Sequence, residues 1–151
     1  MLLRSGTPAD GEAVARVQIA SWQAAYAHLF SAEQLGAIPL EERTRLWQRF
    51  PPIVAELDGQ VVGFVAVGNG ELYAIYVHPG HWGTGIGREL MRAGEAQLSE
   101  LGHTSVFLWV FEDNPQARRF YEAAGWSTDG ETKEAELFGM SAPVVRYTKT
   151  L

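Results

Sequence analysis

The period of the hydrophobic pattern changes sharply at Ile53, and this change constrains the fold more than any other feature of the 151-residue sequence. Between residues 7 and 50, apolar side chains recur every three to four residues, which indicates helices. From Ile53 onward, β-branched and aromatic residues alternate around turn signals, which indicates strands. After residue 85, helical and strand patterns follow each other in turn. One mixed sheet covered by helices on both faces accommodates this order.

Turn and capping residues divide these two parts into elements. Threonine followed by proline at positions 7 and 8 is typical of a helix N-terminus, and an Asp-Gly pair at positions 58 and 59 is typical of a hairpin. The expected helices begin at Thr7, Ser31 and Pro39, the first running to about His28 and the third to Phe50, and two more cover 85–101 and 114–125. The expected strands are 1–5, 53–57, 60–67, 71–78, 104–111, 126–128 and 144–149.

Length and composition describe one ordinary globular domain, residues 1–151. Hydrophobic residues make up 46% and charged residues 20%, which argues against disorder. No apolar run approaches the roughly 20 residues that cross a bilayer. The first residues show no secretory signal pattern, so a cytoplasmic location is expected.

Charge and cysteine content exclude several kinds of chemistry. The net charge of −6 opposes nucleic-acid binding and suits cationic amine substrates. The absence of cysteine excludes thiolate metal sites and a cysteine-borne acyl intermediate. Among the four histidines, the pair His78 and His81 has no accompanying carboxylates, so no metal site is expected.

A glycine-rich turn, residues 78–87, joins an expected strand to an expected helix. The first turn of a helix has backbone N–H groups without partners, and glycine lets a phosphate approach them closely. A plain tight turn is the alternative interpretation. A dinucleotide fingerprint beginning at Gly83 is excluded because position 88 is arginine, and no Walker-type Gly-Lys-Ser/Thr triplet occurs.

This turn resembles the signature of the GNAT acetyltransferase superfamily, Q/R-x-x-G-x-G/A after a strand with a hydrophobic-x-Pro end. The signature glycines correspond to Gly85 and Gly87, and Trp82 stands where the family has Gln or Arg. A second resemblance follows in residues 114–126, which match the spacing N-x-x-A-x-x-F-Y-x-x-x-G-W. The two motifs and their flanks cover residues 71–126.

The resemblance implies the fold and the cofactor. The implied fold is α/β (α+β), with a single mixed, mostly antiparallel central sheet, a splayed parallel strand pair formed by 72–77 and 106–111, and helices on both faces. The implied activity is transfer of the acetyl group of acetyl-CoA to a primary amine by direct attack in a ternary complex. The implied cofactor-binding residues are Ile75, Tyr76, Val77, Trp82, Gly83, Thr84, Gly85, Ile86, Gly87, Arg88, Asn114, Ala117, Phe120 and Tyr121.

The same resemblance assigns two catalytic roles. Tyr121 is the implied general acid for the departing thiolate, and Glu71 is the implied general base for the amine, with Glu112 and His78 as alternatives. Strict alternation along the strand would place Glu71 on the same face as Ile75 and Val77. A backbone N–H near Val77 is expected to polarise the thioester carbonyl.

Several of these positions also have a purely structural interpretation. Asn114 fits a helix cap, Tyr121 and Phe120 fit the core, and Arg88 fits a solvated helix face. The helices of residues 20–50 are implied to form part of the acceptor pocket, with Trp22, Tyr26 and Phe30 as lining residues or core.

The acceptor and the activity itself stay open at this stage. A protein N-terminus, a lysine, a polyamine, an amino acid or an antibiotic fits the sequence equally well. A non-catalytic acyl-CoA sensor or an interaction module on the same fold is the alternative function, and many relatives in the family dimerise, so a homodimer is possible.

Overall fold

The structure, a computed structural model, describes residues 1–151. The change of period at Ile53 corresponds to the end of three consecutive helices and the start of the second strand. The helices are α1 (Gly11–Ala25), α2 (Ala32–Gly36), α3 (Leu40–Arg49), α4 (Ile86–Glu100) and α5 (Pro115–Ala123), with short 3-10 turns η1 (Pro8–Asp10) and η2 (Pro79–His81). The strands are β1 (Leu2–Ser5), β2 (Ile53–Leu57), β3 (Gln60–Gly68), β4 (Glu71–Val77), β5 (Ser105–Phe111), β6 (Ser127–Leu137) and β7 (Met140–Thr150).

All seven strands belong to one sheet in the order β1-β2-β3-β4-β5-β7-β6. Every neighbouring pair is antiparallel except β4 and β5, which are parallel. The expected mixed, mostly antiparallel sheet with a parallel pair is therefore confirmed.

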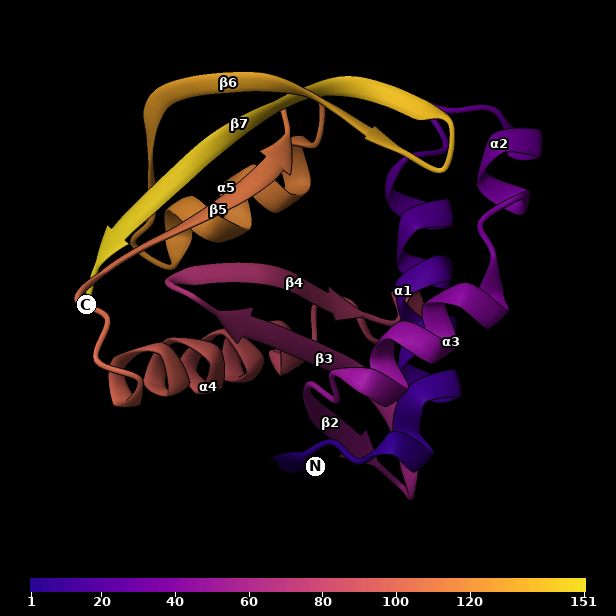
Figure 1. Ribbon diagram of the computed structural model, residues 1–151, viewed down its shortest axis with the longest axis horizontal. Coiled ribbons are helices and arrows are strands. Elements are labelled where there is room, and N and C mark those ends of the chain that lie inside the picture. Colours follow the sequence, from indigo (N-terminus) through magenta and orange to yellow (C-terminus); the bar gives the residue numbers. More distant parts are fainter.

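The parallel pair is joined at one end only. Glu71 and Phe107 form its single register pair, next to a hydrogen bond in which the Phe107 N–H donates to the Gly70 carbonyl at 3.1 Å. Beyond this point β4 and β5 separate, so the sheet divides into a β1–β4 half and a β5–β7 half (Figure 1). The backbone of β4 past Glu71 consequently has a strand partner on one edge only.

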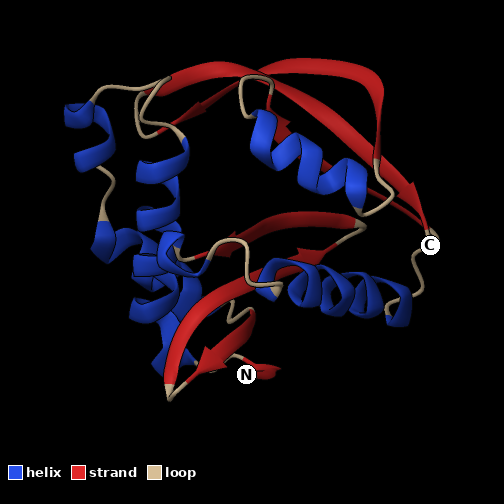
Figure 2. Ribbon diagram, turned by 180° about the vertical axis from the view of Figure 1, so that it is seen from behind, coloured by secondary structure: helices blue, strands red, loops and turns tan.

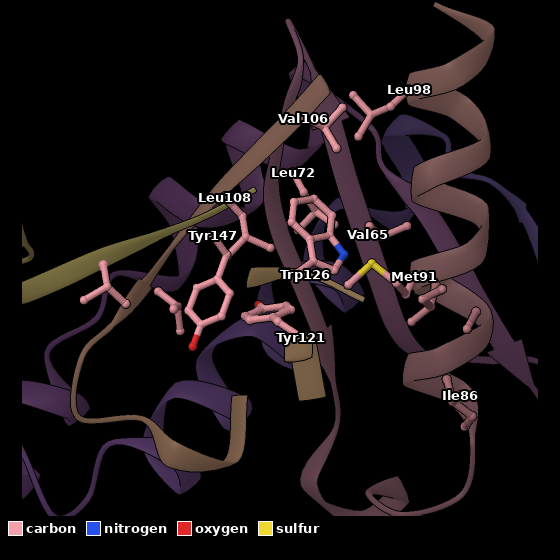
Figure 3. Close-up of a cluster of buried hydrophobic side chains, with 14 of the residues drawn as sticks. Val65, Leu72, Ile86, Met91, Leu98, Val106, Leu108, Tyr121, Trp126 and Tyr147 are labelled. Atoms are coloured by element: carbon pink, nitrogen blue, oxygen red, sulfur yellow. The ribbon is translucent and has the colours of Figure 1, made fainter. Parts of the chain in front are cut away.

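Helices cover both faces of the sheet. On one face, α4 lies along the β2–β4 half and α5 along the β5–β7 half (Figure 2). Their apolar side chains share a buried cluster with both halves, and Leu98 and Tyr147 are fully buried in it (Figure 3). On the other face, α1 packs against β3 and β4, and α3 packs against α1. No helix of the chain is both long and apolar enough to cross a bilayer.

Most expected elements are confirmed to within about two residues, and the terminal hairpin is the largest difference. Strands expected at 126–128 and 144–149 extend over 127–137 and 140–150. Most side chains of β6 are exposed and polar, so no apolar alternation marks this edge strand. The first helix also ends early, at Ala25 instead of His28, because Tyr26 leaves the helical region at φ −116°.

A β-bulge in β4 changes which side chains share a face. Ala66 pairs with Ala74 and Val67 pairs with Leu72, so Tyr73 between them has no partner in β3. Leu72 therefore packs on the α4 face together with Ile75, three residues later. Since Glu71 precedes Leu72, its side chain belongs to the opposite face, with Ala74. The expectation that Glu71 shares a face with Ile75 and Val77 was wrong, because the bulge interrupts the two-residue period.

Candidate active site

The glycine turn presents a row of backbone donors at the start of α4. Gly83 and Gly85 have φ values of 75° and 86°, in the left-handed region that glycine tolerates, and a Cβ at either would meet no atom within 4 Å. The six consecutive N–H groups of residues 83–88 donate to no acceptor in the protein. The turn therefore presents unpaired donors with open space at Gly83 and Gly85, and its binding of an anion stays a prediction.

Trp82 and Thr84 hold the turn in place with hydrogen bonds inside the protein. The indole N–H of Trp82 donates to the Val77 carbonyl at 2.7 Å, and Thr84 Oγ1 donates to the His81 carbonyl at 2.6 Å. At the signature position, the tryptophan thus connects the turn to the end of β4. Arg88, in the first turn of α4, is exposed and forms no ion pair.

The peptide groups at the end of β4 point into the gap between the two sheet halves. The His78 N–H donates to the Val62 carbonyl of β3 at 2.8 Å. Because hydrogen-bonded and non-hydrogen-bonded pairs alternate along an antiparallel ladder, the N–H groups of Val77 and Ile75 point away from β3. Strand β5 has already separated at this height, so these N–H groups have no strand partner.

Tyr121 lies on α5, facing the cluster beneath the gap. Its side chain is 8% exposed and lies near Tyr147, with ring centroids 6.1 Å apart (Figure 3). The phenol forms no hydrogen bond with any protein group. Burial raises its pKa above the ordinary value, and the hydroxyl of Tyr76 contributes to the rise. The phenol is thus neutral over the physiological pH range and has its donor unused.

Phe120, Ala117 and Ile86 close the space around Tyr121. A Cβ on Gly87 would lie 3.3 Å from the Phe120 ring, so the missing side chain lets α5 contact the first turn of α4. Ala117 packs against the same cluster, and Ile86 is buried in it. These predicted cofactor residues therefore come together around the start of α4.

Asn114 is a buried cap. Its Oδ1 accepts a hydrogen bond from the Ala117 N–H at 3.1 Å, and its Nδ2 donates to the Tyr26 hydroxyl at 3.1 Å. The structural interpretation of Asn114 is therefore supported, since both polar atoms have partners within the protein. The assignment of Asn114 to cofactor binding stays a prediction.

The three aromatic residues predicted for the acceptor pocket are almost fully buried. Trp22, Tyr26 and Phe30 are 5%, 4% and 7% exposed, and each packs edge-on against Phe111. Trp22 also donates a hydrogen bond to the Tyr76 hydroxyl at 2.8 Å. This packing favours the core interpretation, and contact with an acceptor stays a prediction for them.

Glu71 lies at the joined end of the parallel pair and faces away from α4. Partial burial raises the pKa of its carboxyl, and the charge of Lys133 acts against the rise. The Lys133 ammonium itself lies 4.2 Å from the centre of the Trp109 ring.

Two residues of this region have no counterpart among the predicted site residues. Ser21 donates to the Val77 carbonyl at 2.9 Å, and its position in the apolar stripe of α1 was a signal that it is buried. Arg43, on α3, contacts the ring of Phe138 and has no sequence motif around it. No group of three or more His, Asp or Glu side chains has the geometry of a metal site.

The fold is a mixed α/β domain whose parallel strand pair separates past Glu71, with a row of unpaired amides at the start of α4 and an unbonded phenol on α5. The chain belongs to the acetyltransferase (GNAT) family, because that family's sequence model matches residues 12–126. The family resemblance read from the two motifs is confirmed.

Individual relatives agree with this assignment. The uncharacterized N-acetyltransferase YuaI of Bacillus subtilis is 30% identical over 127 residues, which cover 76% of this chain and 73% of YuaI. A mycothiol acetyltransferase of Thermobispora bispora is 36% identical over 129 residues, covering 72% of this chain but 44% of that protein. The chain thus spans less than half of the mycothiol enzyme.

Solved structures establish the fold independently. A GCN5-related N-acetyltransferase from Rhodopseudomonas palustris superposes with a TM-score of 0.85 at 24% identity, over 99% of this chain and 95% of that one. The PaiA N-acetyltransferase of Thermoplasma acidophilum, solved in complex with coenzyme A, superposes with a TM-score of 0.79 at 19% identity, over 99% and 98%.

Proposed function

We propose that this protein transfers the acetyl group of acetyl-CoA to a primary amine by direct attack. The observation that carries the proposal is the row of six unpaired N–H groups at residues 83–88, which adjoins the unpaired Val77 N–H on the separated part of β4. Such a row at a helix start suits a pyrophosphate, because backbone donors and the helix dipole both favour negative charge.

The thioester arm of the co-substrate suits the gap between β4 and β5. The N–H groups of Ile75 and Val77 supply donors along this edge, as a strand partner would. One of them, at Val77, is the proposed donor to the thioester carbonyl oxygen as negative charge develops there. Fixed backbone donors of this kind stabilise the tetrahedral intermediate without reorganising.

The amine requires deprotonation before it attacks. A lysine-like ammonium has a pKa near 10.4, so only about one molecule in a thousand is neutral at pH 7. Glu71 is the proposed base, acting directly or through water, and its raised pKa makes it a better proton acceptor than an ordinary glutamate. The neutral nitrogen then attacks the carbonyl carbon, the resulting N–H₂⁺ of the tetrahedral intermediate loses its second proton to solvent, the C–S bond breaks, and an amide and coenzyme A are formed.

Tyr121 is proposed to protonate the departing thiolate. Its phenol has no partner within the protein and stays neutral, as a proton donor must. A free phenol is about 1.5 pKa units less acidic than a thiol, and burial widens that difference. The proton is therefore expected to move only as sulfur acquires charge, and the phenolate then recovers a proton from solvent or from the protonated base.

The proposal is tested by measuring coenzyme A release from acetyl-CoA across a panel of primary amines. Thermal-shift measurements provide a second readout, since ligand at about 100 times its Kd stabilises a protein by roughly 2.7 kcal/mol. We expect acetyl-CoA to raise the melting temperature and NAD to leave it unchanged. Stabilisation by acetyl-CoA without release above background for any amine would favour the acyl-CoA sensor instead.

A further inference from the structure

Arg43 carries a largely buried guanidinium with most of its donors unused. Its side chain is 16% exposed, and its Nε is buried with no hydrogen-bond partner. The only acceptor in reach is the carboxylate of Glu42, at 3.4 Å from Nη2, and the Glu42 side chain is 57% exposed. A guanidinium has five N–H donors, so one long bond leaves most of its capacity unmet.

A chain of contacts connects Arg43, through Phe138 and Trp22, to Tyr76 of β4. Its guanidinium carbon lies 4.9 Å from the centre of the Phe138 ring, in the turn between β6 and β7. Phe138 packs edge-on against Trp22, and Trp22 donates to the hydroxyl of Tyr76. Arg43 thus joins α3 to the tip of the terminal hairpin, which in turn packs against the residue that donates to Tyr76.

Burial raises the pKa of Tyr76, while the hydrogen bond from Trp22 and the charge of Arg43 act against the rise. The contacts of Arg43 with Phe138, of Phe138 with Trp22 and of Trp22 with Tyr76 connect the guanidinium to that hydroxyl. Tyr76 packs on the α1 side of the sheet, the face to which the bulge also assigns Glu71. The Glu71 carboxylate and the Arg43 guanidinium, whose Nε has no hydrogen-bond partner, consequently belong to the same side of the sheet, at different heights along β4.

We propose that Arg43 binds the carboxylate of the acceptor, and that the acceptors are amines carrying a carboxylate, such as amino acids and their derivatives. The proposal rests on the acetyltransferase function proposed above. A planar fork of N–H donors matches a carboxylate in geometry and charge, and low exposure strengthens the pairing. Diamines and polyamines would place a second cation near Arg43 and are disfavoured.

The test compares acceptors that differ only in the anionic group. β-Alanine is compared with β-alaninamide, and phosphoethanolamine with ethanolamine, using kcat/KM for coenzyme A release. The same pairs are assayed with Arg43→Ala. The preference within each pair, as a ratio of kcat/KM values, is then compared between the two proteins, because the difference in amine pKa within a pair is the same for both. Arg45→Ala is the matched control, because Arg45 is an exposed arginine of the same helix that forms no ion pair.

We expect the native protein to prefer β-alanine and Arg43→Ala to lose this preference. The loss should appear as a KM for β-alanine raised roughly 10- to 150-fold, the range typical of lost hydrogen bonds to a charged group. The KM for acetyl-CoA and the kinetics with ethanolamine should change little. Arg45→Ala should retain the native preference.

Arg43→Lys covers the case in which the alanine variant does not fold, since lysine keeps the charge and the stem but not the fork. It should retain part of the preference. Two results overturn the inference and leave the acetyltransferase function standing. In the first, the native protein acetylates both members of each pair with no preference. In the second, the preference survives in Arg43→Ala. A larger preference for phosphoethanolamine overturns the carboxylate assignment. The absence of turnover with any amine overturns the acetyltransferase proposal and the inference with it.

Discussion

The indole N–H of Trp82 donates to the carbonyl oxygen of Val77 at 2.7 Å, so the turn before α4 is tied to the last residue of β4. The hydroxyl of Ser21, on α1, donates to the same oxygen at 2.9 Å. Two donors, one from α1 and one from the turn before α4, thus fix the peptide group that follows Val77. They also fix the direction of the neighbouring Val77 N–H, the proposed donor to the thioester.

Because Trp82 and Ser21 donate to the same carbonyl oxygen, substitutions at these two residues should have non-additive effects on the free energy of unfolding. Trp82→Phe and Ser21→Ala should each lower the free energy of unfolding by about 0.5–1.5 kcal/mol, because the Val77 oxygen keeps one donor. The double variant should lose more than the sum, by about 0.5–3 kcal/mol, because that oxygen then has no protein donor. Urea denaturation of the four proteins measures the coupling. Strict additivity would mean that the two donors act independently.

Tyr121→Phe should separate catalysis from stability. Turnover is expected to fall by about 10²–10⁴-fold, the usual contribution of a positioned acid, with the Kd for acetyl-CoA within a few-fold of native. The melting temperature should not fall, because the phenol forms no hydrogen bond within the protein.

Tyr147→Phe is the contrasting control for Tyr121. The Tyr147 hydroxyl accepts from Arg118 Nε at 3.0 Å and donates to Glu122 at 2.8 Å, so its removal should cost about 1.5–3 kcal/mol of stability. Native turnover in Tyr121→Phe would remove the acid assignment.

Glu71→Gln should change the pH dependence of the reaction. A general base acts only when deprotonated, so the native kcat/KM should fall as pH drops through the raised pKa of Glu71. The variant should be slowest relative to native between that pKa and neutral pH, and the difference should shrink as pH approaches the pKa of the amine. A pH-rate profile of both proteins measures this. An equal loss at every pH would indicate positioning instead of proton transfer.

The same carboxyl should also affect stability in a defined direction. Because its pKa is higher in the folded state, the folded protein binds more protons than the unfolded chain between the two pKa values. The contribution of Glu71 to stability is therefore lost as pH rises through the folded pKa. Denaturation of Glu71→Gln at pH 7 should show no loss of stability relative to native, and a clear loss would contradict this burial effect.

Local signals in the sequence were sufficient for most of the fold. The Asp58-Gly59 turn, the Ser31 capping box and the Asn114-Pro115 helix start all occur where expected, because each depends on residues next to it in the chain. Strand β6 was not predictable to its full length, since its exposed polar residues pair with β7 through backbone bonds that any side chain permits.

The parts of the candidate site that depend on backbone conformation were predictable from the sequence. The parts that depend on side-chain packing were less predictable. Gly83 and Gly85 adopt positive φ values, which glycine tolerates and which a glycine-rich sequence signals. The face of the sheet on which the Glu71 side chain lies depends on a β-bulge, and no residue type in β4 predicts that bulge. Arg43 depends on a contact with Phe138, 95 positions away in the sequence, which only the folded chain brings about.

Gly85→Ala tests whether the conformation of the turn, and not its flexibility, is required for cofactor binding. Gly85 has φ 86°, where alanine costs roughly 1–2 kcal/mol, although nothing within 4 Å would obstruct the new methyl group. The turn should relax toward negative φ and misalign the N–H groups of residues 83–88, weakening acetyl-CoA binding by about tenfold or more.

Gly36→Ala is the matched control, because this glycine ends α2 without a positive φ and also has nothing within 4 Å. It should stabilise the protein by about 0.4–1 kcal/mol and leave the affinity unchanged. Calorimetric titration of the three proteins with acetyl-CoA decides between the possibilities. Native affinity in a folded Gly85→Ala variant would show that the diphosphate binds elsewhere, since the donors it is proposed to contact depend on this one backbone angle.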